Sequence, residues 1–128
     1  LQPLPVPIPS ERMRPVDVTY ASRDGQAEFR AAILAAYGRC AVTGCQVEAV
    51  LQAAHIIPYV DARSNLISNG LCLRSDIHGL YDRNLIRIAG DGGIVVDEAV
   101  GCPEYRALHG RQIVTPEAQA HKPDPVLM

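Results

Sequence analysis

The sequence predicts a small α+β domain in the order helix, strand, loop, strand, helix, β-hairpin, helix. Apolar residues recur at helical spacing over 27–37 and predict a first helix. Short apolar runs bounded by turn residues follow and predict strands. A Gly- and Asp-rich segment over 89–93 lies between two further apolar runs and predicts a hairpin. A chain of 128 residues suits one such domain.

The helix over 27–37 is the clearest element. Phe29, Ile33 and Tyr37 lie on one face of it, on an Ala-rich background. Gly38 follows and is well placed to end the helix, because glycine adopts the left-handed conformation without strain.

The middle of the chain alternates apolar and polar segments. We expect strands over 50–57 and 71–73, with a polar loop over 61–70 between them. Ser75 resembles an N-cap and predicts a second helix from about 76 to 83.

The remaining elements are short. Strands over 86–88 and 94–96 would form the hairpin, and Pro103 can open a helix that runs to about 108. Gly110 is expected to stop that helix.

Proline-rich segments flank this compact region. Alternating prolines favour extended chain and remove backbone donors. We therefore divide the chain into a linker or arm over 1–22, a domain over 23–112 and an extended tail over 113–128. The start of the sequence resembles a piece cut from a longer protein.

Composition narrows the class of protein. The net charge of -2 argues against a broad basic surface for nucleic acid. No run of 18 or more apolar residues predicts a membrane span, and no secretion signal is visible. We therefore expect a cytoplasmic domain with no membrane partner.

Four polar side chains form a candidate site. His55 lies in a predicted strand, Asn69 in the loop before the next strand, and His78 and Asp82 four positions apart on a predicted helix. Residues four apart share a helix face. A strand–loop–helix unit could therefore bring all four groups together.

These motifs resemble those of the HNH endonucleases, the ββα-metal nucleases. The matching pieces, in order, are Phe29-Arg30, Tyr37, Cys40-Ala-Val-Thr-Gly44, Ala53-Ala-His-Ile56, Asn69-Gly-Leu71, His78 and Asp82. The resemblance covers about residues 24–90 and implies a ββα-metal core. It also implies a metal-dependent DNA endonuclease, the cleavage module of a restriction or defence protein, that leaves 5′-phosphate and 3′-hydroxyl ends.

The resemblance assigns a role to each residue. His55 would be the general base, and imidazole suits this task because it titrates near neutrality. Asn69 would hold the catalytic loop and orient the ring of His55. His78 and Asp82 would hold one divalent metal, with Mg²⁺ favoured and Mn²⁺, Ni²⁺ or Zn²⁺ as alternatives.

The chain departs from the family pattern just before His55. Many HNH enzymes have an Asp or His there as a metal ligand, and this chain has Ala54. Water and phosphate oxygens could complete the coordination, or Asp61 or Asp76 could supply a ligand. The alternative is a catalytically degenerate HNH fold that binds DNA or a protein.

Other side chains have candidate roles in binding. Arg74 and Arg83 flank the predicted metal helix and are expected to contact DNA phosphates. Asp82 could instead pair with Arg83 or Arg87. The linker-like segment over 1–22 suggests a DNA-recognition domain upstream in the full-length protein, and the resemblance leaves a homodimer open.

The four cysteines allow a further alternative. Cys40 to Cys45 predicts a tight turn around Gly44. Tetrahedral zinc would need Cys40, Cys45, Cys72 and Cys102 to converge, which would make a small zinc-ribbon-like domain. We expect buried reduced thiols and no structural zinc.

Overall fold

The structure is a computed structural model and describes residues 25–128. The α helices and strands confirm the predicted α+β class, and η marks a short 3₁₀ helix. In chain order the elements are α2 (Gln26–Tyr37), η1 (Glu48–Val50), β1 (Leu51–His55), η2 (Ala62–Asn65), η3 (Ile67–Asn69), β2 (Gly70–Arg74), α3 (Ser75–Asp82), β3 (Ile86–Ile88), β4 (Ile94–Val96), α4 (Pro103–Arg106) and η4 (Gln119–His121).

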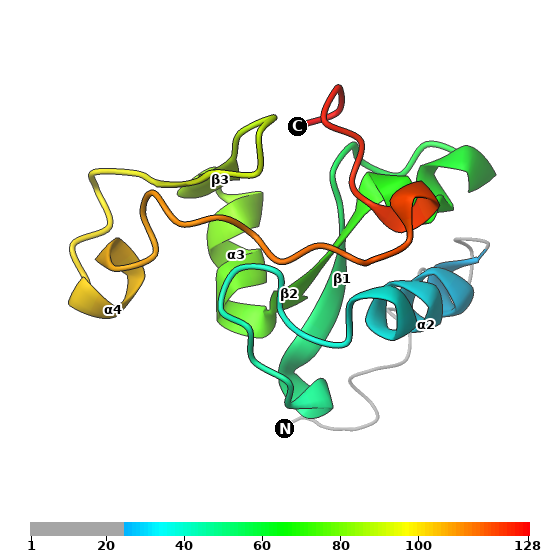
Figure 1. Cartoon of the computed structure of the whole chain (residues 1–128), viewed down its shortest axis with the longest axis horizontal. Helices are drawn as coiled ribbons and strands as arrows, with labels where there is room; N and C mark the ends of the chain where they lie inside the picture. The colour runs from blue at the N-terminus through cyan, green and yellow to red at the C-terminus, as the bar shows by residue number, and fades with distance from the viewer. Residues whose placement is uncertain (1–24) are drawn as a thin grey trace, which may run out of the picture.

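The centre of the fold is an antiparallel pair of strands between two helices (Figure 1). β1 and β2 pair along their whole length, from Leu51 opposite Arg74 to His55 opposite Gly70. Helix α2 packs on one face of the pair and α3 on the other. Because successive side chains of a strand point to opposite faces, β1 sends neighbouring residues toward different helices.

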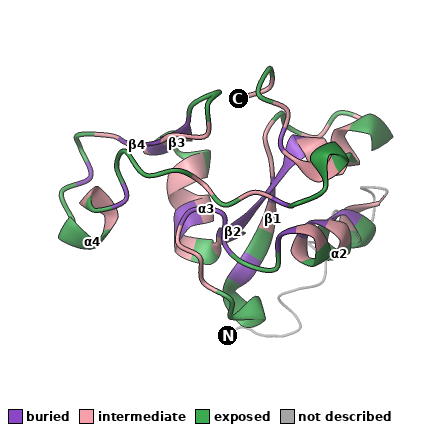
Figure 2. Ribbon diagram, viewed as in Figure 1, coloured by how far each residue is buried: buried purple, intermediate pink, exposed green. Residues whose placement is uncertain are grey.

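Burial is concentrated where the helices meet this sheet (Figure 2). Phe29 and Ile33 of α2, Leu71 and Leu73 of β2, and Ile77 of α3 are almost fully buried. Four of the five residues of β2 are buried, as expected of a strand covered on both faces. The aliphatic core that the composition requires therefore lies along β2.

Gly70 lets α2 approach the sheet closely. A Cβ atom on Gly70 would overlap Ile33 and would lie 2.9 Å from the ring of Phe29. The hydroxyl of Tyr37 donates to the carbonyl of Gly70 at 2.9 Å and fixes the same contact. The close approach matters for the site because Gly70 is the partner of His55 in the strand pair.

The predicted turns are confirmed. Gly38 ends α2 with φ 70°, and its N–H donates to Leu34 O. Gly44 has φ 78°, and its N–H donates to Cys40 O at 2.9 Å, which closes the tight turn. Both positions use the left-handed backbone that glycine adopts most easily.

The start of α3 differs from the prediction. The N-cap is Arg74, with extended backbone, and Ser75 is the first helical residue. The side chain of Asp76 accepts the N–H of Ile77 and so satisfies a free donor of the first turn. The polar loop over 61–70 is also more ordered than predicted, since it contains η2 and η3.

The elements after α3 follow the prediction. β3 and β4 form the antiparallel hairpin, with Ile86 opposite Val96. α4 begins at Pro103 and is shorter than expected. None of the helices in residues 25–128 is long and apolar enough to cross a membrane.

The C-terminal segment lies on the domain. It crosses from α4 toward α2 (orange to red in Figure 1). Val114 N–H donates to Ala41 O at 2.8 Å, and Asp124 N–H donates to Ser68 O at 2.9 Å. The predicted extended tail over 113–128 is extended only in part, since it contains η4 and a turn, and it packs on the body. The predicted arm over 1–22 falls outside the described residues.

Replacement of Gly70 by alanine should destabilise the domain by about 1–3 kcal/mol, because the new methyl group enters a packed core. Gly101→Ala is the matched control, since a Cβ there meets no atom within 4 Å. Urea unfolding of both variants measures the difference. Equal unfolding midpoints would contradict the close packing of α2 on β2.

Candidate functional site

His55 is the last residue of β1 and faces α2. Its ring stacks on Phe29 with centroids 4.2 Å apart and an interplanar angle of 4°, and Tyr59 meets it edge-on at 6.1 Å. Nε2 lies 2.9 Å from Oδ1 of Asn65. The stack fixes the plane of the ring, and the hydrogen bond fixes its rotation within that plane.

The contact with Asn65 also sets the proton position on His55. A carboxamide oxygen can only accept a hydrogen bond, so the ring proton lies on Nε2. A neutral ring then carries its lone pair on Nδ1. That nitrogen is the one available to take a proton from water.

Asn69 is the buried polar residue of the core, at 5% exposure. Oδ1 accepts the N–H of Ile57, and Nδ2 donates to Ile57 O at 3.1 Å and to Ser64 O at 2.8 Å. These bonds tie the loop after β1 to the start of β2, as predicted for a residue that holds the loop. The expected orientation of His55 by Asn69 is wrong: both amide protons of Asn69 bind backbone oxygens, and Asn65 orients the ring instead.

His78 lies on the α3 side of the sheet, between a strand residue and a helix residue. Nδ1 is 2.7 Å from Oε1 of Gln52 on β1, and Nε2 is 3.4 Å from Oδ2 of Asp82. The His78 side chain is 23% exposed and that of Asp82 is 63% exposed. The pair therefore opens to solvent at the end of α3.

Both nitrogens of His78 face oxygen acceptors. The Gln52 oxygen requires a proton on Nδ1, so a neutral ring presents a lone pair from Nε2 toward the Asp82 carboxylate. Two acceptors repel unless a cation lies near both. The cation can be a proton on the ring or a metal ion. Two ligand atoms of one small ion stand about 3–3.5 Å apart when each metal–ligand bond is about 2.1 Å, and the 3.4 Å between Nε2 and Oδ2 lies in that range.

His55 and Asp82 lie at one cavity. His55 ends β1 and Asp82 ends α3, and both line an open cavity of about 450 Å³. Arg87 and the C-terminal residues Leu127 and Met128 line it as well. The structure therefore brings His55 and Asp82 to one cavity and places His78 beside Asp82.

His78 and Asp82 of α3 offer two donors for a metal, and the rest of residues 25–128 places no third donor beside them. Ala54 is a core residue at 1% exposure. Asp61 accepts from Arg63, and Asp76 accepts from Arg74 and Tyr105, so the expected alternative ligands are already engaged. Among residues 25–128 no three His, Cys, Asp or Glu side chains cluster as a metal site. A divalent ion that keeps several waters fits this donor set.

Arg74, predicted to contact DNA, has a partner within the domain. It donates twice to Asp76, at 2.7 and 2.9 Å, and Tyr105 of α4 donates to the same carboxylate at 2.7 Å. The Arg74 guanidinium and the Tyr105 hydroxyl lower the pKa of Asp76 to about 2. The group joins the start of α3 to α4, at the opposite end of α3 from Asp82.

Arg83 and Arg87 lie nearer the cavity. Arg83 is exposed and donates to Gly79 O at 3.2 Å. Arg87 pairs with Asp97 at 3.2 Å, so neither arginine takes Asp82 as its partner. The alternative in which Asp82 serves only as a salt-bridge partner of these arginines is wrong.

The cysteines are all free thiols. Cys40 and Cys72 are buried, and Cys40 Sγ accepts the N–H groups of Thr43 and Arg74 at 3.3 and 3.2 Å. Burial, and to a lesser extent Cys40, raises the pKa of the Cys72 thiol to about 11. Cys102 is exposed at the start of α4.

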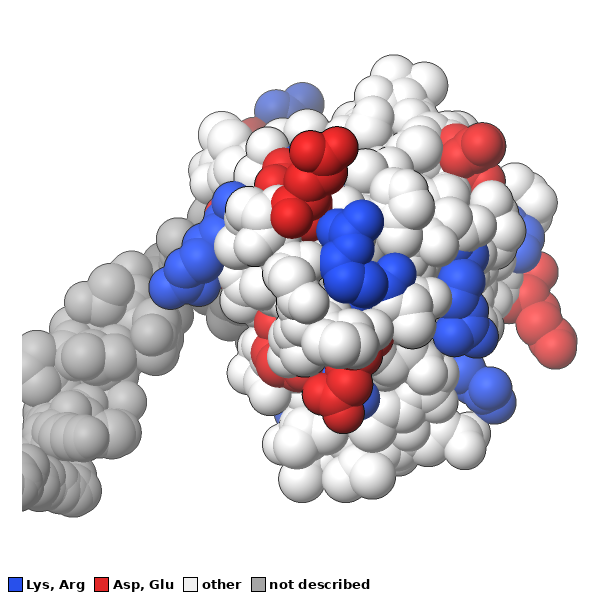
Figure 3. Space-filling model, turned by 90° about the vertical axis from the view of Figure 1, so that its left-hand side faces the viewer, with Lys and Arg blue, Asp and Glu red and all other residues white. Residues whose placement is uncertain are grey.

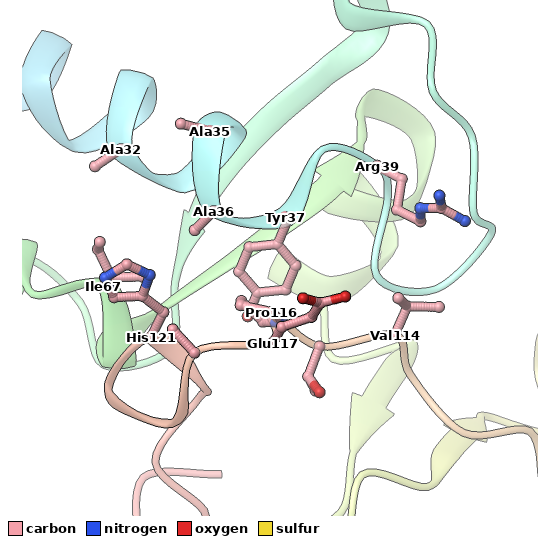
Figure 4. A pocket seen from close by; sticks show the side chains of 12 residues that line it. Ala32, Ala35, Ala36, Tyr37, Arg39, Ile67, Val114, Pro116, Glu117 and His121 are labelled. Atoms are coloured by element: carbon pink, nitrogen blue, oxygen red, sulfur yellow. The ribbon is translucent and has the colours of Figure 1, made fainter.

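Other surfaces carry no comparable group. A cavity of about 710 Å³ lies between α2 and the C-terminal segment, with Ala32, Ala36 and Tyr37 on one side and Pro116 and His121 on the other (Figure 4). His55, His78 and Asp82 do not line it. On the face drawn in Figure 3, basic and acidic side chains are interspersed, in keeping with the net charge of -2.

Residues 40–89 match the HNH endonuclease family. The match supports a place for these residues in the HNH superfamily. The match spans both strands of the central pair, the loop between them, α3 and β3. It indicates a nuclease-type function, for which DNA is the implied substrate and a divalent metal the usual cofactor. No curated protein matches the chain.

Three residues of the HNH site were missed from sequence: Gln52, Asn65 and Arg87. Gln52 and Asn65 each bind a histidine of the site, and Arg87 lines the cavity. One indication for Gln52 was present in the sequence. It is a polar residue next to Ala53 in a predicted strand, where neighbouring side chains point to opposite faces. Asn65 had no local signal, since it contacts His55 only after the loop folds back.

Asn69→Asp should destabilise the domain by about 2–3 kcal/mol. The aspartate keeps the shape but replaces two donors with acceptors that face the carbonyls of Ile57 and Ser64. Urea unfolding measures the loss. Amide exchange should accelerate over residues 56–69 and stay unchanged in the β3–β4 hairpin; a variant as stable as the wild type would refute the role of the amide.

Proposed function

We propose that this HNH domain is a metal-dependent DNA endonuclease that hydrolyses phosphodiester bonds to 5′-phosphate and 3′-hydroxyl ends. One observation carries the proposal. His55, which presents Nδ1, and Asp82 line one cavity, and Nε2 of His78 lies 3.4 Å from Oδ2 of Asp82. A base and a cation site side by side are what phosphodiester hydrolysis needs.

His55 acts as the general base in this proposal. Asn65 holds the proton on Nε2, so Nδ1 accepts a proton from the attacking water. The parallel stack on Phe29 restrains the ring during this transfer. Asn69 acts indirectly, because it holds the loop that carries Asn65.

His78 and Asp82 hold the metal in this proposal, with Mg²⁺ the favoured ion. A bound divalent ion would stabilise charge on the phosphate and on the leaving 3′ oxygen. The position at the carboxyl end of α3 favours a cation, because the helix dipole is negative there. Water and phosphate oxygens complete the coordination, since Ala54 supplies no ligand.

Arg83 and Arg87 contact the DNA backbone in this proposal. Both lie at or just after the carboxyl end of α3, and arginine binds phosphate through paired donors. With a net charge of -2, the domain gains little affinity from its overall field. A separate DNA-recognition domain, in a restriction or defence protein, would supply the remaining affinity.

A second candidate is a noncatalytic HNH module that binds DNA or a protein. The observation in its favour is Ala54, whose burial leaves two side-chain ligands for the metal. The two candidates differ in whether DNA is cut when metal is present.

Plasmid nicking in Mg²⁺, Mn²⁺ or Ni²⁺ tests the proposal. The wild type should nick, and His55→Ala should lower the rate about 100-fold or more, because proton transfer to a positioned base is lost. His121→Ala is the control, since His121 lines the other cavity. Equal nicking by wild type and His55→Ala would exclude His55 as the base, and no nicking in any metal would favour the noncatalytic module.

A further inference from the structure

Gln52 is a polar side chain at an unusual place in the fold. It is the second residue of β1, opposite Leu73 of the buried strand β2, and is itself exposed. Its carboxamide reaches across to α3, where Oε1 is 2.7 Å from Nδ1 of His78. This is the direct polar link between the side chains of β1 and α3 at the site.

The contact determines which nitrogen of His78 can bind a metal. A neutral imidazole carries one proton, and a metal binds the nitrogen without it. The Gln52 oxygen stabilises the proton on Nδ1, and the lone pair on Nε2 then faces Asp82. With the opposite tautomer, Nδ1 would direct its lone pair at the Gln52 oxygen, and Nε2 would be blocked by its proton.

We propose that Gln52 is a positioning residue that fixes His78 in the Nδ1–H tautomer and so prepares Nε2 to bind the metal. The inference rests on the proposed function for the identity of the site, but the tautomer is a property of the metal-free protein. Partners of this kind on the second ring nitrogen typically change metal affinity by 10–100-fold.

Two carboxamides, those of Asn65 and Gln52, then place the ring proton on opposite nitrogens of the two histidines. Asn65 places the proton of His55 on Nε2, and Gln52 places that of His78 on Nδ1. Each histidine is left with the free nitrogen that its proposed task requires. Gln52 lies on β1, whereas His78, the proposed metal ligand that it orients, lies on α3.

Nuclear magnetic resonance of the ¹⁵N-labelled, metal-free protein tests the tautomer directly. The chain has four histidines, so His78→Ala identifies the His78 ring signals by their loss. At a pH where imidazole is neutral, the wild type should show His78 protonated on Nδ1. In Gln52→Leu this preference should be lost, whereas Gln52→Glu should keep it, because either carboxylate oxygen can accept the proton.

Gln46→Leu is the matched control, since Gln46 is an exposed glutamine outside the strand pair. It should leave the His78 signals unchanged. Calorimetric titration with Mn²⁺ adds a second readout: Gln52→Leu should weaken binding about 10-fold and Gln52→Glu should restore it. If the leucine variant does not fold, Gln52→Thr replaces it, because threonine suits a strand.

Wild-type His78 protonated on Nε2, or a Gln52→Leu variant with the same tautomer and Mn²⁺ affinity as wild type, would overturn the inference. A failure of the proposed function has another signature: no DNA nicking by a wild-type protein whose His78 is protonated on Nδ1. That result would support the role of Gln52 in setting the tautomer while refuting the nuclease.

Discussion

Asn69 donates both its amide protons and accepts a third hydrogen bond, and all three partners are backbone groups of the loop after β1. Each of these groups would cost about 1–3 kcal/mol if it were buried without a partner. The loop is therefore held in one conformation against the start of β2. That conformation brings Asn65 to His55 and sets His55 opposite Gly70, so the position of the His55 ring depends on this amide.

The strand pair that Asn69 closes also separates the two chemical tasks. His55 and Gln52 lie on opposite faces of β1, so His55 packs against α2 while α3, which carries His78, packs against the other face. The tasks meet again only at the carboxyl ends of β1 and α3, where His55 and Asp82 line one cavity. A short sheet covered on both sides thus supports each histidine separately and still brings His55 and Asp82, the neighbour of His78, to one cavity.

The sequence predicted much of this arrangement. Helix α2, both central strands, the hairpin and the residues His55, His78 and Asp82 follow from local spacing and from the resemblance to HNH motifs. The partners of the histidines could not be predicted in the same way. Asn65 and Gln52 reach them across 10 and 26 positions, and such contacts depend on how the loop and α3 fold back.

Asn69 and Arg74 both have partners within the domain that the local sequence did not indicate. Asn69 was expected to orient His55 because its motif position suggested it, but the loop backbone uses its amide first. Arg74 was expected to bind DNA because it flanks α3, and it donates to Asp76, which also accepts from Tyr105. In both cases, the hydrogen bonds of the side chain are made to groups within the domain, although its position in the sequence suggested a catalytic partner or DNA.

A crystal structure of the protein with Mn²⁺ and a short DNA duplex tests the central claim most directly. The account predicts one ion bound by Nε2 of His78 and Oδ2 of Asp82, with Gln52 on Nδ1 of His78 and Nδ1 of His55 facing the scissile phosphate. An ion bound elsewhere, or a phosphate that His55 cannot reach, would contradict it.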